Sequence, residues 1–233
     1  MTISDITMKN LQGVATATLT GALQQRGLHQ VFFTGLKPIK PGQRMIGTAK
    51  TLRYAPMRED LRGHFAKNVN AQRAAIESIG PGEVMCIEAR GNVGAGTFGD
   101  IYAQRMHMRG ATGIVTDGGV RDSGAVAGLD IAVYLVAAHA ATLNLEHIAV
   151  DADCPVTIGG VLVMPGDVIV GDDDGAMVIP ADLIDEVAAE AAEQERKDAF
   201  SFLLVTRGDD ITQAFPMNAE RKAEFEVWKA NQA

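Results

Sequence analysis

Cysteine is scarce in this sequence, and its scarcity excludes a disulfide framework. Only two of the 233 residues are cysteines, Cys86 in VMCIEA and Cys154 in DADCPV. A disulfide-stapled scaffold or a zinc site would need more cysteines at closer spacing. Cys86 lies within an apolar segment, so we expect it to be a small buried residue.

Long apolar runs are also absent. No segment approaches the roughly 18 consecutive apolar residues that a membrane-spanning helix needs. The first ten residues, MTISDITMKN, lack the basic and then apolar order of a signal peptide. We therefore expect a cytoplasmic protein that does not contact a membrane.

Basic residues are outnumbered by acidic ones. The chain has 29 Asp and Glu against 21 Lys and Arg, which gives a net charge of −8. Proteins that bind nucleic acid derive most of that affinity from clustered Lys and Arg that neutralise phosphates. We therefore expect no nucleic-acid partner.

Hydrophobic periodicity predicts an α/β fold in layers. The apolar segments 83–89 and 111–118 are expected strands joined through a helix over 101–110, and this βαβ crossover implies a parallel pair. From residue 131 onwards, short β-rich segments alternate with turn residues, which predicts a meander or a swivelling β layer rather than further βαβ units. Further elements are a strand over 45–52 and helices over 5–28, 65–79 and 182–199.

No repeat and no Pro/Gly/Ser-rich linker divides the chain. This uniformity predicts one domain over residues 1–205, followed by a C-terminal extension over 206–233 with a helix near 220–229.

A glycine-rich turn, GAGTFG over 94–99, follows the first strand of the βαβ unit and opens its helix. With Asp117 at the end of the next strand, this pattern matches a dinucleotide fingerprint, in which backbone amides approach a pyrophosphate. The β-rich second half offers no second nucleotide-binding unit, so we favour an anion-binding turn for a smaller ligand. A dinucleotide-binding oxidoreductase and a purely structural turn are the alternatives.

A second turn, DGGVRD over 117–122, follows the second strand. Its two glycines can present Arg121 and Asp122 at the carboxyl end of the sheet, where open α/β folds bind ligands. A surface ion pair between the two side chains is the alternative. Asp100 precedes Arg121 with 20 residues between them, so both turns should converge on one crevice.

Two other groups of residues do not indicate a catalytic or metal-binding role. The acidic turn DDDG over 172–175 fails as an EF-hand because Val170 occupies a ligand position, so we expect a β-turn between strands. The lysines Lys37, Lys40, Lys50 and Lys67 lie outside the βαβ unit, which argues against a Schiff-base aldolase.

The segment FGDIYAQRMHMRGATGIVTDGGVRD over 98–122, with PGDVIVGDDDGAMVIP over 165–180, resembles the RraA-like family across roughly residues 15–195. This family includes divalent-metal-dependent pyruvate aldolases that act on 4-hydroxy-4-methyl-2-oxoglutarate and 4-carboxy-4-hydroxy-2-oxoadipate. The resemblance implies a layered α/β/β/α sandwich of the swivelling-domain type, with the site on the central βαβ unit. It also implies a lyase that releases pyruvate from a 4-hydroxy-2-oxo acid and that decarboxylates oxaloacetate through the same enolate.

The resemblance further implies the roles of the site residues. Asp122 would bind Mg²⁺ or Mn²⁺, Arg121 would contact the pyruvyl oxygens, and Asp100 would orient a water beside the metal. The substrate-binding set is Gly99, Asp100, Ile101, Tyr102 and Arg121, with the backbone amides of Ile101 and Tyr102 holding the substrate carboxylate.

The same family includes regulators that bind and inhibit ribonuclease E, which is the competing function. That branch lacks the aspartate after the arginine, so Asp122 favours an enzyme. The resemblance implies homotrimers or homohexamers, and a glutamate that some members supply to a neighbouring subunit could correspond to Glu193 or Glu195. Gly21 stands where members often carry an acidic residue, which leaves the choice of aldol acceptor open.

Overall fold

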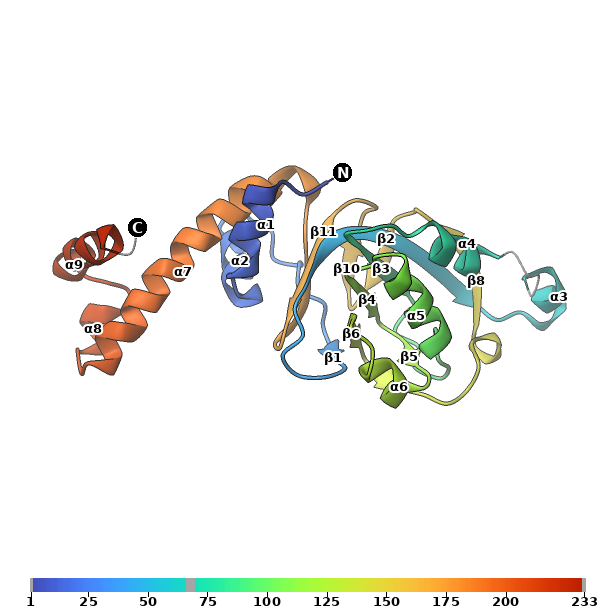
Figure 1. Cartoon of the computed structure of the whole chain (residues 1–233). Helices are drawn as coiled ribbons and strands as arrows, with labels where there is room; N and C mark the ends of the chain where they lie inside the picture. The colour runs from blue at the N-terminus through green and yellow to red at the C-terminus, as the bar shows by residue number, and fades with distance from the viewer. Residues whose placement is uncertain (1, 66–69, 232–233) are drawn as a thin grey trace.

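An eight-stranded sheet forms the centre of the part of the chain that the computed structural model describes, residues 2–65 and 70–231 (Figure 1). Its strands run in the order β1-β6-β4-β3-β2-β11-β12, and β8 pairs with the second half of β2. Two short pairs, β9 with β10 and β5 with β7, lie outside this sheet. The strands are β1 (Lys37–Pro38), β2 (Met45–Pro56), β3 (Glu83–Glu88), β4 (Gly113–Thr116), β5 (Gly119–Val120), β6 (Ala132–Leu135), β7 (Ala137–Ala138), β8 (His147–Ala152), β9 (Val156–Ile158), β10 (Val161–Val163), β11 (Val168–Asp172) and β12 (Gly175–Ile179).

Helices cover both faces of this sheet (Figure 1). Residues of α4 and α5, with Val126 of α6, form the core on one face, and α1, α2 and α7 pack with β12 and the β9–β10 pair on the other. The helices are α1 (Asp5–Gln12), α2 (Thr16–Gln24), α3 (Arg62–Phe65), α4 (Ala71–Ser78), α5 (Asp100–Met108), α6 (Ser123–Ala127), α7 (Ile184–Thr206), α8 (Ile211–Ala214) and α9 (Ala219–Ala230). The predicted α/β class is therefore confirmed.

The predicted βαβ unit is also confirmed. β3 pairs in parallel with β4 on one side and with β2 on the other, and α5 connects β3 to β4. Along β3 the side chains alternate between the two cores, because successive residues of a strand point to opposite faces. Cys86 is fully buried in one core, as expected, and Met85 is fully buried in the other.

The single helix predicted over 5–28 is wrong, because the chain forms two helices there. Gly13 caps the end of α1, and α2 begins at Thr16. The carbonyls of Leu11 and Val14 at this break accept hydrogen bonds from the guanidinium of Arg44. A side chain from β2 therefore satisfies carbonyls that have no partner in a following helical turn.

The expectation that parallel pairing ends before residue 131 is also wrong. β6 pairs in parallel with β4, and the short helix α6 forms the crossover between them. The antiparallel part begins later, with β8 beside β2 and with the β11–β12 hairpin. The helix α6 spans only five residues, which is too short for a periodic pattern to reveal.

Two other predicted helices differ in extent. α4 begins at Ala71, where the Asn70 side chain accepts a hydrogen bond from the backbone N–H of Arg73. Residues 66–69 of the helix predicted over 65–79 lie outside the described residues. The helix predicted over 182–199 is α7, which runs on to Thr206.

The C-terminal helices project away from the sheet (Figure 1). α8 and α9 pack against the end of α7 through a small core that includes Phe200, Leu204 and Phe225. The helix predicted near 220–229 is α9, whereas the domain boundary at 205 stays a prediction. Within the described ranges, no helix combines the length and the apolar character that crossing a bilayer requires.

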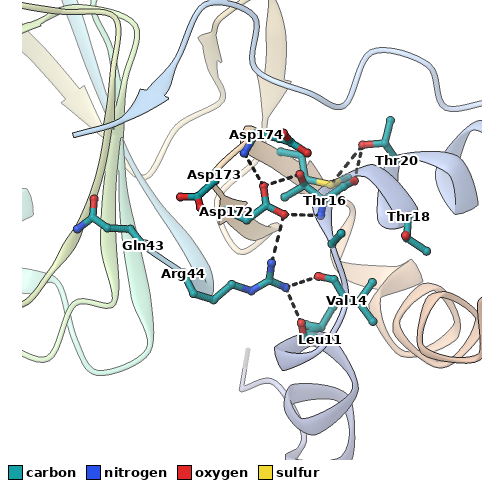
Figure 2. Close-up of polar contacts among 12 residues, drawn as sticks. Leu11, Val14, Thr16, Thr18, Thr20, Gln43, Arg44, Asp172, Asp173 and Asp174 are labelled. Carbon is teal, nitrogen blue, oxygen red and sulfur yellow. Dashed lines mark hydrogen bonds and ion pairs between the residues drawn. The ribbon is translucent and has the colours of Figure 1, made fainter. Parts of the chain in front are cut away.

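The acidic turn predicted to be structural closes the β11–β12 hairpin, in which Asp172 pairs with Gly175. Figure 2 shows that the Asp172 carboxylate caps the start of α2, accepting hydrogen bonds from the backbone N–H of Thr16 at 2.7 Å and from its hydroxyl at 2.8 Å. The guanidinium of Arg44 lies 3.5 Å from the same carboxylate. This ion pair joins the end of α1 and the start of α2 to the sheet.

We expect Asp172→Ala to destabilise the fold by about 2 kcal/mol, because it removes a helix cap and a partner of Arg44 together. The matched control is Asp174→Ala in the same turn, since no hydrogen bond or ion pair of the Asp174 carboxylate is seen among the described residues. We expect the control to change stability by less than about 0.5 kcal/mol. Urea unfolding measures both, and equal midpoints for the two variants would contradict the capping role.

Candidate active site

The turn that carries Arg121 and Asp122 is anchored by a buried aspartate. Asp117 follows β4, and its carboxylate accepts hydrogen bonds from the backbone N–H groups of Ala89 at 2.6 Å and Gly91 at 2.8 Å. Burial raises the pKa of the Asp117 carboxyl, although these two hydrogen bonds oppose the shift. Asp117 therefore ties the carboxyl ends of β3 and β4 together instead of serving as the ribose ligand of a dinucleotide site.

The glycine-rich turn over 94–99 lies against β5. The backbone N–H of Gly96 donates to the carbonyl of Ala141, and that of Thr97 donates to the carbonyl of Gly119. These amides are thus already bonded to backbone and are not available to a pyrophosphate. The geometry gives no support to the dinucleotide alternative.

The glycines of this turn make room for Arg121 and Asp122. A Cβ atom on Gly96 would lie 2.2 Å from Cγ of Arg121, and one on Gly99 would lie 2.6 Å from Oδ2 of Asp122. Asp122 itself has a φ of 53°, a left-handed conformation that is uncommon outside glycine. The motif is therefore explained by the close approach of the two functional side chains.

An open cavity of about 590 Å³ brings together three of the predicted site residues. Asp100, in the first turn of α5, lines the same cavity as Arg121 and Asp122, which connect β5 to α6. Nη2 of Arg121 is 3.9 Å from Oδ2 of Asp122, and the two side chains are 38% and 44% exposed. So loose and exposed a pair contributes little to stability, and both groups remain accessible to a ligand.

Asp122 suits a hydrated hard cation rather than a closed metal cage. No cluster of three His, Cys, Asp or Glu side chains able to hold a metal is found among the described residues. Mg²⁺ keeps several waters and needs only one or two protein carboxylates, and this cavity offers Asp122 and Asp100. A structural zinc site would need about four ligands, which the cavity lacks.

The other predicted substrate-binding residues, Gly99, Ile101 and Tyr102, lie at the start of α5 but do not line the cavity of Asp100, Arg121 and Asp122. Gly99 is the N-cap of the helix and makes no side-chain cap, and the backbone N–H of Ile101 donates to Oδ1 of Asp100 at 2.8 Å. The Ile101 side chain is 77% exposed and lines an apolar groove between α4 and α5, away from the cavity that holds Asp122. Tyr102 also borders this groove, and its hydroxyl accepts a hydrogen bond from Nε of Arg73.

A second cavity, of about 240 Å³, lies on the other side of Arg121. Gly96, Gly99, Tyr102 and Arg121 line it together with residues that the sequence did not indicate. These are Asn70, Gln72 and Arg73 at the start of α4, and Thr142, Leu143 and Asn144 before β8. Their only sequence signal is the helix-capping position of Asn70.

The buried side chain of Gln72 supports this wall of the site. Its Nε2 donates to the hydroxyl of Tyr54 at 2.7 Å and to the carbonyl of Thr97 at 2.7 Å. Because Thr97 is bonded in turn to Gly119, α4 and β2 both hold the glycine-rich turn in place.

His139 is a further residue that the sequence did not indicate. It borders the cavity of Asp100 and Asp122, and its backbone N–H donates to the carbonyl of Val120, next to Arg121. Its Nδ1 accepts a hydrogen bond from the backbone N–H of Ala141 at 3.1 Å, which leaves Nε2 as the protonated nitrogen of the neutral ring. Only the parallel pairing of β5 with β7 brings His139 here.

The two glutamates considered for a neighbouring site both have partners within this chain. Glu195 accepts hydrogen bonds from the backbone N–H of Ala15 and the hydroxyl of Thr18. Glu193 pairs with Lys229 and Arg196, and the hydrogen bond from Lys229 lowers the pKa of its carboxyl. A role for either in a second subunit stays a prediction.

Comparison with known proteins places this chain within a family. The family described as RraA-like, Aldolase/RraA, matches residues 16–178. A protein of Halalkalibacterium halodurans, provisionally named 4-hydroxy-4-methyl-2-oxoglutarate aldolase, is 29% identical over 185 residues, which cover 79% of this chain and 81% of that protein. Protein DlpA of Legionella pneumophila is 27% identical over 180 residues, 77% of this chain, but the match spans only 28% of the length of DlpA.

Solved structures agree with this fold. The crystal structure of RraAS2 from Streptomyces coelicolor, described as an unusual member of the RNase ES inhibitor RraA protein family, is 31% identical with a TM-score of 0.77 and covers 85% of this chain and 96% of that chain. An uncharacterized protein from Pseudomonas syringae superimposes with a TM-score of 0.80 at 23% identity, over 92% of this chain and 98% of that one. The second likeness concerns the fold alone.

Proposed function

This chain belongs to the RraA-like family, Aldolase/RraA, and we propose that it is a divalent-metal-dependent lyase that cleaves a 4-hydroxy-2-oxo acid to pyruvate and a second carbonyl compound. The observation that carries this proposal is the convergence of Asp100, Arg121 and Asp122 on one accessible cavity at the end of the parallel strands. The provisional aldolase name of the Halalkalibacterium halodurans relative supports the same reaction class.

Asp122 would hold the cation, Mg²⁺ or Mn²⁺, because it is an exposed carboxylate with only a loose ion-pair partner. When bound, such a cation acts as a Lewis acid on the 2-oxo oxygen, where negative charge develops. Asp100 is the second oxygen donor in the same cavity.

Arg121 stabilises the same developing charge with a fixed positive group. Its planar guanidinium can donate parallel hydrogen bonds to the carboxylate and the 2-oxo oxygen of the substrate. Its backbone N–H donates to the carbonyl of Phe98 at 2.9 Å, which fixes the start of the side chain beside the glycine-rich turn. At the start of α5 the backbone N–H of Ile101 already donates to Oδ1 of Asp100, so among the two predicted amides that of Tyr102 would contact the substrate carboxylate at the positive end of the helix.

Asp100 would act as the general base and the general acid of the reaction. Cleavage of the C3–C4 bond removes the proton of the C4 hydroxyl while the electron pair of the bond forms the enolate of pyruvate, and a proton then adds to C3. Asp100 can accept the hydroxyl proton through a water and return one to C3. Oxaloacetate would give the same enolate with carbon dioxide as the leaving fragment, so we propose oxaloacetate decarboxylation as a second activity of this site.

We expect pyruvate release from 4-hydroxy-2-oxo acids and from oxaloacetate to fall at least about tenfold in a chelator, because the cation that would stabilise the negative charge on the 2-oxo oxygen is then removed. Added Mg²⁺ or Mn²⁺ should restore the rate. The assay detects pyruvate with lactate dehydrogenase as the coupling enzyme. A control measures the activity of the coupling enzyme alone in the presence of the chelator. Full activity in chelator together with borohydride trapping of a Schiff base would overturn the metal mechanism.

Inhibition of a ribonuclease is the second candidate function, because the Streptomyces coelicolor structure is described as belonging to an RNase ES inhibitor family. The resemblance links such regulators to the absence of an aspartate after the arginine, and Asp122 stands at that position here. An RNA cleavage assay with a ribonuclease of the E class discriminates the two. Unchanged cleavage at equimolar protein supports the lyase, and inhibition supports the regulator.

A further inference from the structure

A histidine lies buried near the glycine-rich turn and outside the cavity of Asp100 and Asp122. His147 is the first residue of β8 and is fully buried. Its Nδ1 lies 3.0 Å from Nη2 of Arg90. A guanidinium can only donate, so Nδ1 accepts this hydrogen bond and the neutral ring carries its proton on Nε2. Nε2 is also buried and has no hydrogen-bond partner within the described residues.

Arg90 connects this ring to the segment that leads into the glycine-rich turn. It lies between Ala89 and Gly91, whose backbone N–H groups both donate to Asp117. Its φ of 62° is a left-handed conformation that is uncommon outside glycine. Such a conformation persists only where surrounding contacts hold it. The hydrogen bond to His147 is one of these contacts, and it joins the end of β3 to the start of β8.

A second link joins the same two segments. Nδ2 of Asn92 donates to the carboxylate of Glu146 at 3.0 Å, and Oδ1 of Asn92 accepts the backbone N–H of Gly94 at 2.8 Å. Glu146 precedes His147, so adjacent residues where β8 begins hold both Arg90 and Asn92. The start of the glycine-rich turn is therefore fixed to β8.

Tyr54 connects the same histidine to the end of the turn. The ring centroids of Tyr54 and His147 lie 5.7 Å apart, and the buried hydroxyl of Tyr54 donates to the carbonyl of Thr97 at 3.1 Å. Thr97 follows Gly96, where a Cβ atom would lie 2.2 Å from Cγ of Arg121. His147 thus contacts one residue that holds the beginning of the turn and one that holds its end.

The surroundings of the ring favour its neutral form. Burial lowers the pKa of His147, and the positive charge of Arg90 lowers it further. The charge of Glu146 and the backbone carbonyl of Asn92 oppose this shift without reversing it. Arg90 and Glu146 are the charged side chains that act on the ring among the described residues. Tyr54 stays neutral, because burial raises the pKa of its hydroxyl.

We infer that His147 is a positioning residue of the proposed lyase: as a neutral ring it holds the glycine-rich turn against Arg121, and it releases the turn when it takes up a proton. The inference rests on the proposed function. A proton from solvent adds to Nδ1, the atom that accepts the hydrogen bond of Arg90. That hydrogen bond is then lost, and two positive groups face each other beside the turn. Acid therefore lowers activity through a residue that lies outside the cavity of Asp122.

The pH profile of kcat/KM for pyruvate release tests this role. In the wild type we expect a fall of at least about tenfold with a midpoint below about pH 6.5, the ordinary value for histidine. His147→Asn places an amide oxygen where Nδ1 accepts the hydrogen bond, and it cannot take up a proton. We expect this variant to keep at least about a third of the neutral-pH activity and to lose the fall at that midpoint. A merely structural role would lower activity by the same factor at every pH.

Arg90→Met removes the same hydrogen bond from its exposed end, so the fold should survive. We expect kcat/KM at neutral pH to fall about tenfold, because Arg121 is held less firmly. The midpoint of the His147 ring should move to higher pH, because the positive charge beside it is gone. Arg58→Met is the matched control, since Arg58 is an exposed arginine that pairs with Asp60 beyond the end of β2. The control should change neither quantity.

NMR separates this inference from the lyase proposal. The Hε1 signal of His147 reports protonation of the ring, and the amide signals of Gly94, Gly96 and Gly99 report the glycine-rich turn. We expect the amide signals to shift with the midpoint of the ring in the wild type and to stay constant over that range in His147→Asn. That result without pyruvate release would support the positioning role and refute the lyase. Pyruvate release with the same pH profile and the same amide shifts in both proteins would overturn the positioning role and leave the lyase standing.

Discussion

Asp122→Asn is expected to lower kcat for pyruvate release by about a thousandfold, which corresponds to about 4 kcal/mol of transition-state stabilisation. The asparagine keeps the size of the side chain but loses the negative charge that would hold the cation. The fold should survive, because the Asp122 side chain is 44% exposed and its ion pair spans 3.9 Å. Stopped or coupled pyruvate assays at saturating Mg²⁺ measure the loss.

A second readout tests the role of Asp122 without relying on turnover. Binding of Mn²⁺, followed by electron paramagnetic resonance, should be weaker in Asp122→Asn than in the wild type. Asp130→Asn is the control, since Asp130 is an exposed aspartate in the following connection and lies outside the cavity of Asp122. Equal Mn²⁺ affinity in Asp122→Asn and in the wild type would rule out Asp122 as the ligand.

Gly96→Ala is expected to lower kcat/KM by about a hundredfold, the cost of moving a functional group by about 1 Å. The added methyl group would lie 2.2 Å from Cγ and 3.0 Å from Cδ of Arg121, so the arginine has to move. The backbone of Arg121 also lies 3.0 Å from this methyl group. We therefore expect a loss of stability of about 1–3 kcal/mol beside the loss of activity.

The control for this glycine is Gly21→Ala in the middle of α2. A Cβ atom there meets nothing within 4 Å, and alanine is the better helix former by about 1 kcal/mol. The control should keep wild-type activity and gain a little stability. A Gly96→Ala variant as active as Gly21→Ala would show that the position of Arg121 does not govern the reaction.

The part of the site near Arg121 was predictable because its residues lie close together in the sequence. A buried parallel strand is a nearly continuous apolar run, so the segment over 83–89 predicts β3 without further information. The turn after the next strand must then present Arg121 and Asp122 at the carboxyl end of the sheet. Asp100 starts the intervening helix, and a βαβ crossover returns it to the same end.

The break between α1 and α2 and the parallel pairing of β6 were not predictable in the same way. An apolar pattern continues across residues 13–15, and only the guanidinium of Arg44 and the carboxylate of Asp172 show why the chain turns there. The apolar segment of β6 is compatible with either direction of pairing. The five residues of α6 decide that direction, and so short a helix leaves no periodic signal.

Local order along the chain was therefore enough to identify the central strands, the turn with Arg121 and Asp122, and the family resemblance over 98–122, because hydrophobic period and turn chemistry act between residues near in sequence. The residues from α4 and from the loop before β8 that line the cavity of about 240 Å³ were not predictable, because they reach Arg121 only through the packing of segments that are distant in the sequence. Arg73 and Asn144 are separated from Arg121 by 47 and 22 intervening residues and meet it only because α4 and the loop before β8 fold beside the glycine-rich turn. No local sequence pattern predicts that these residues lie together, because their proximity results from the burial of apolar surface over the whole sheet.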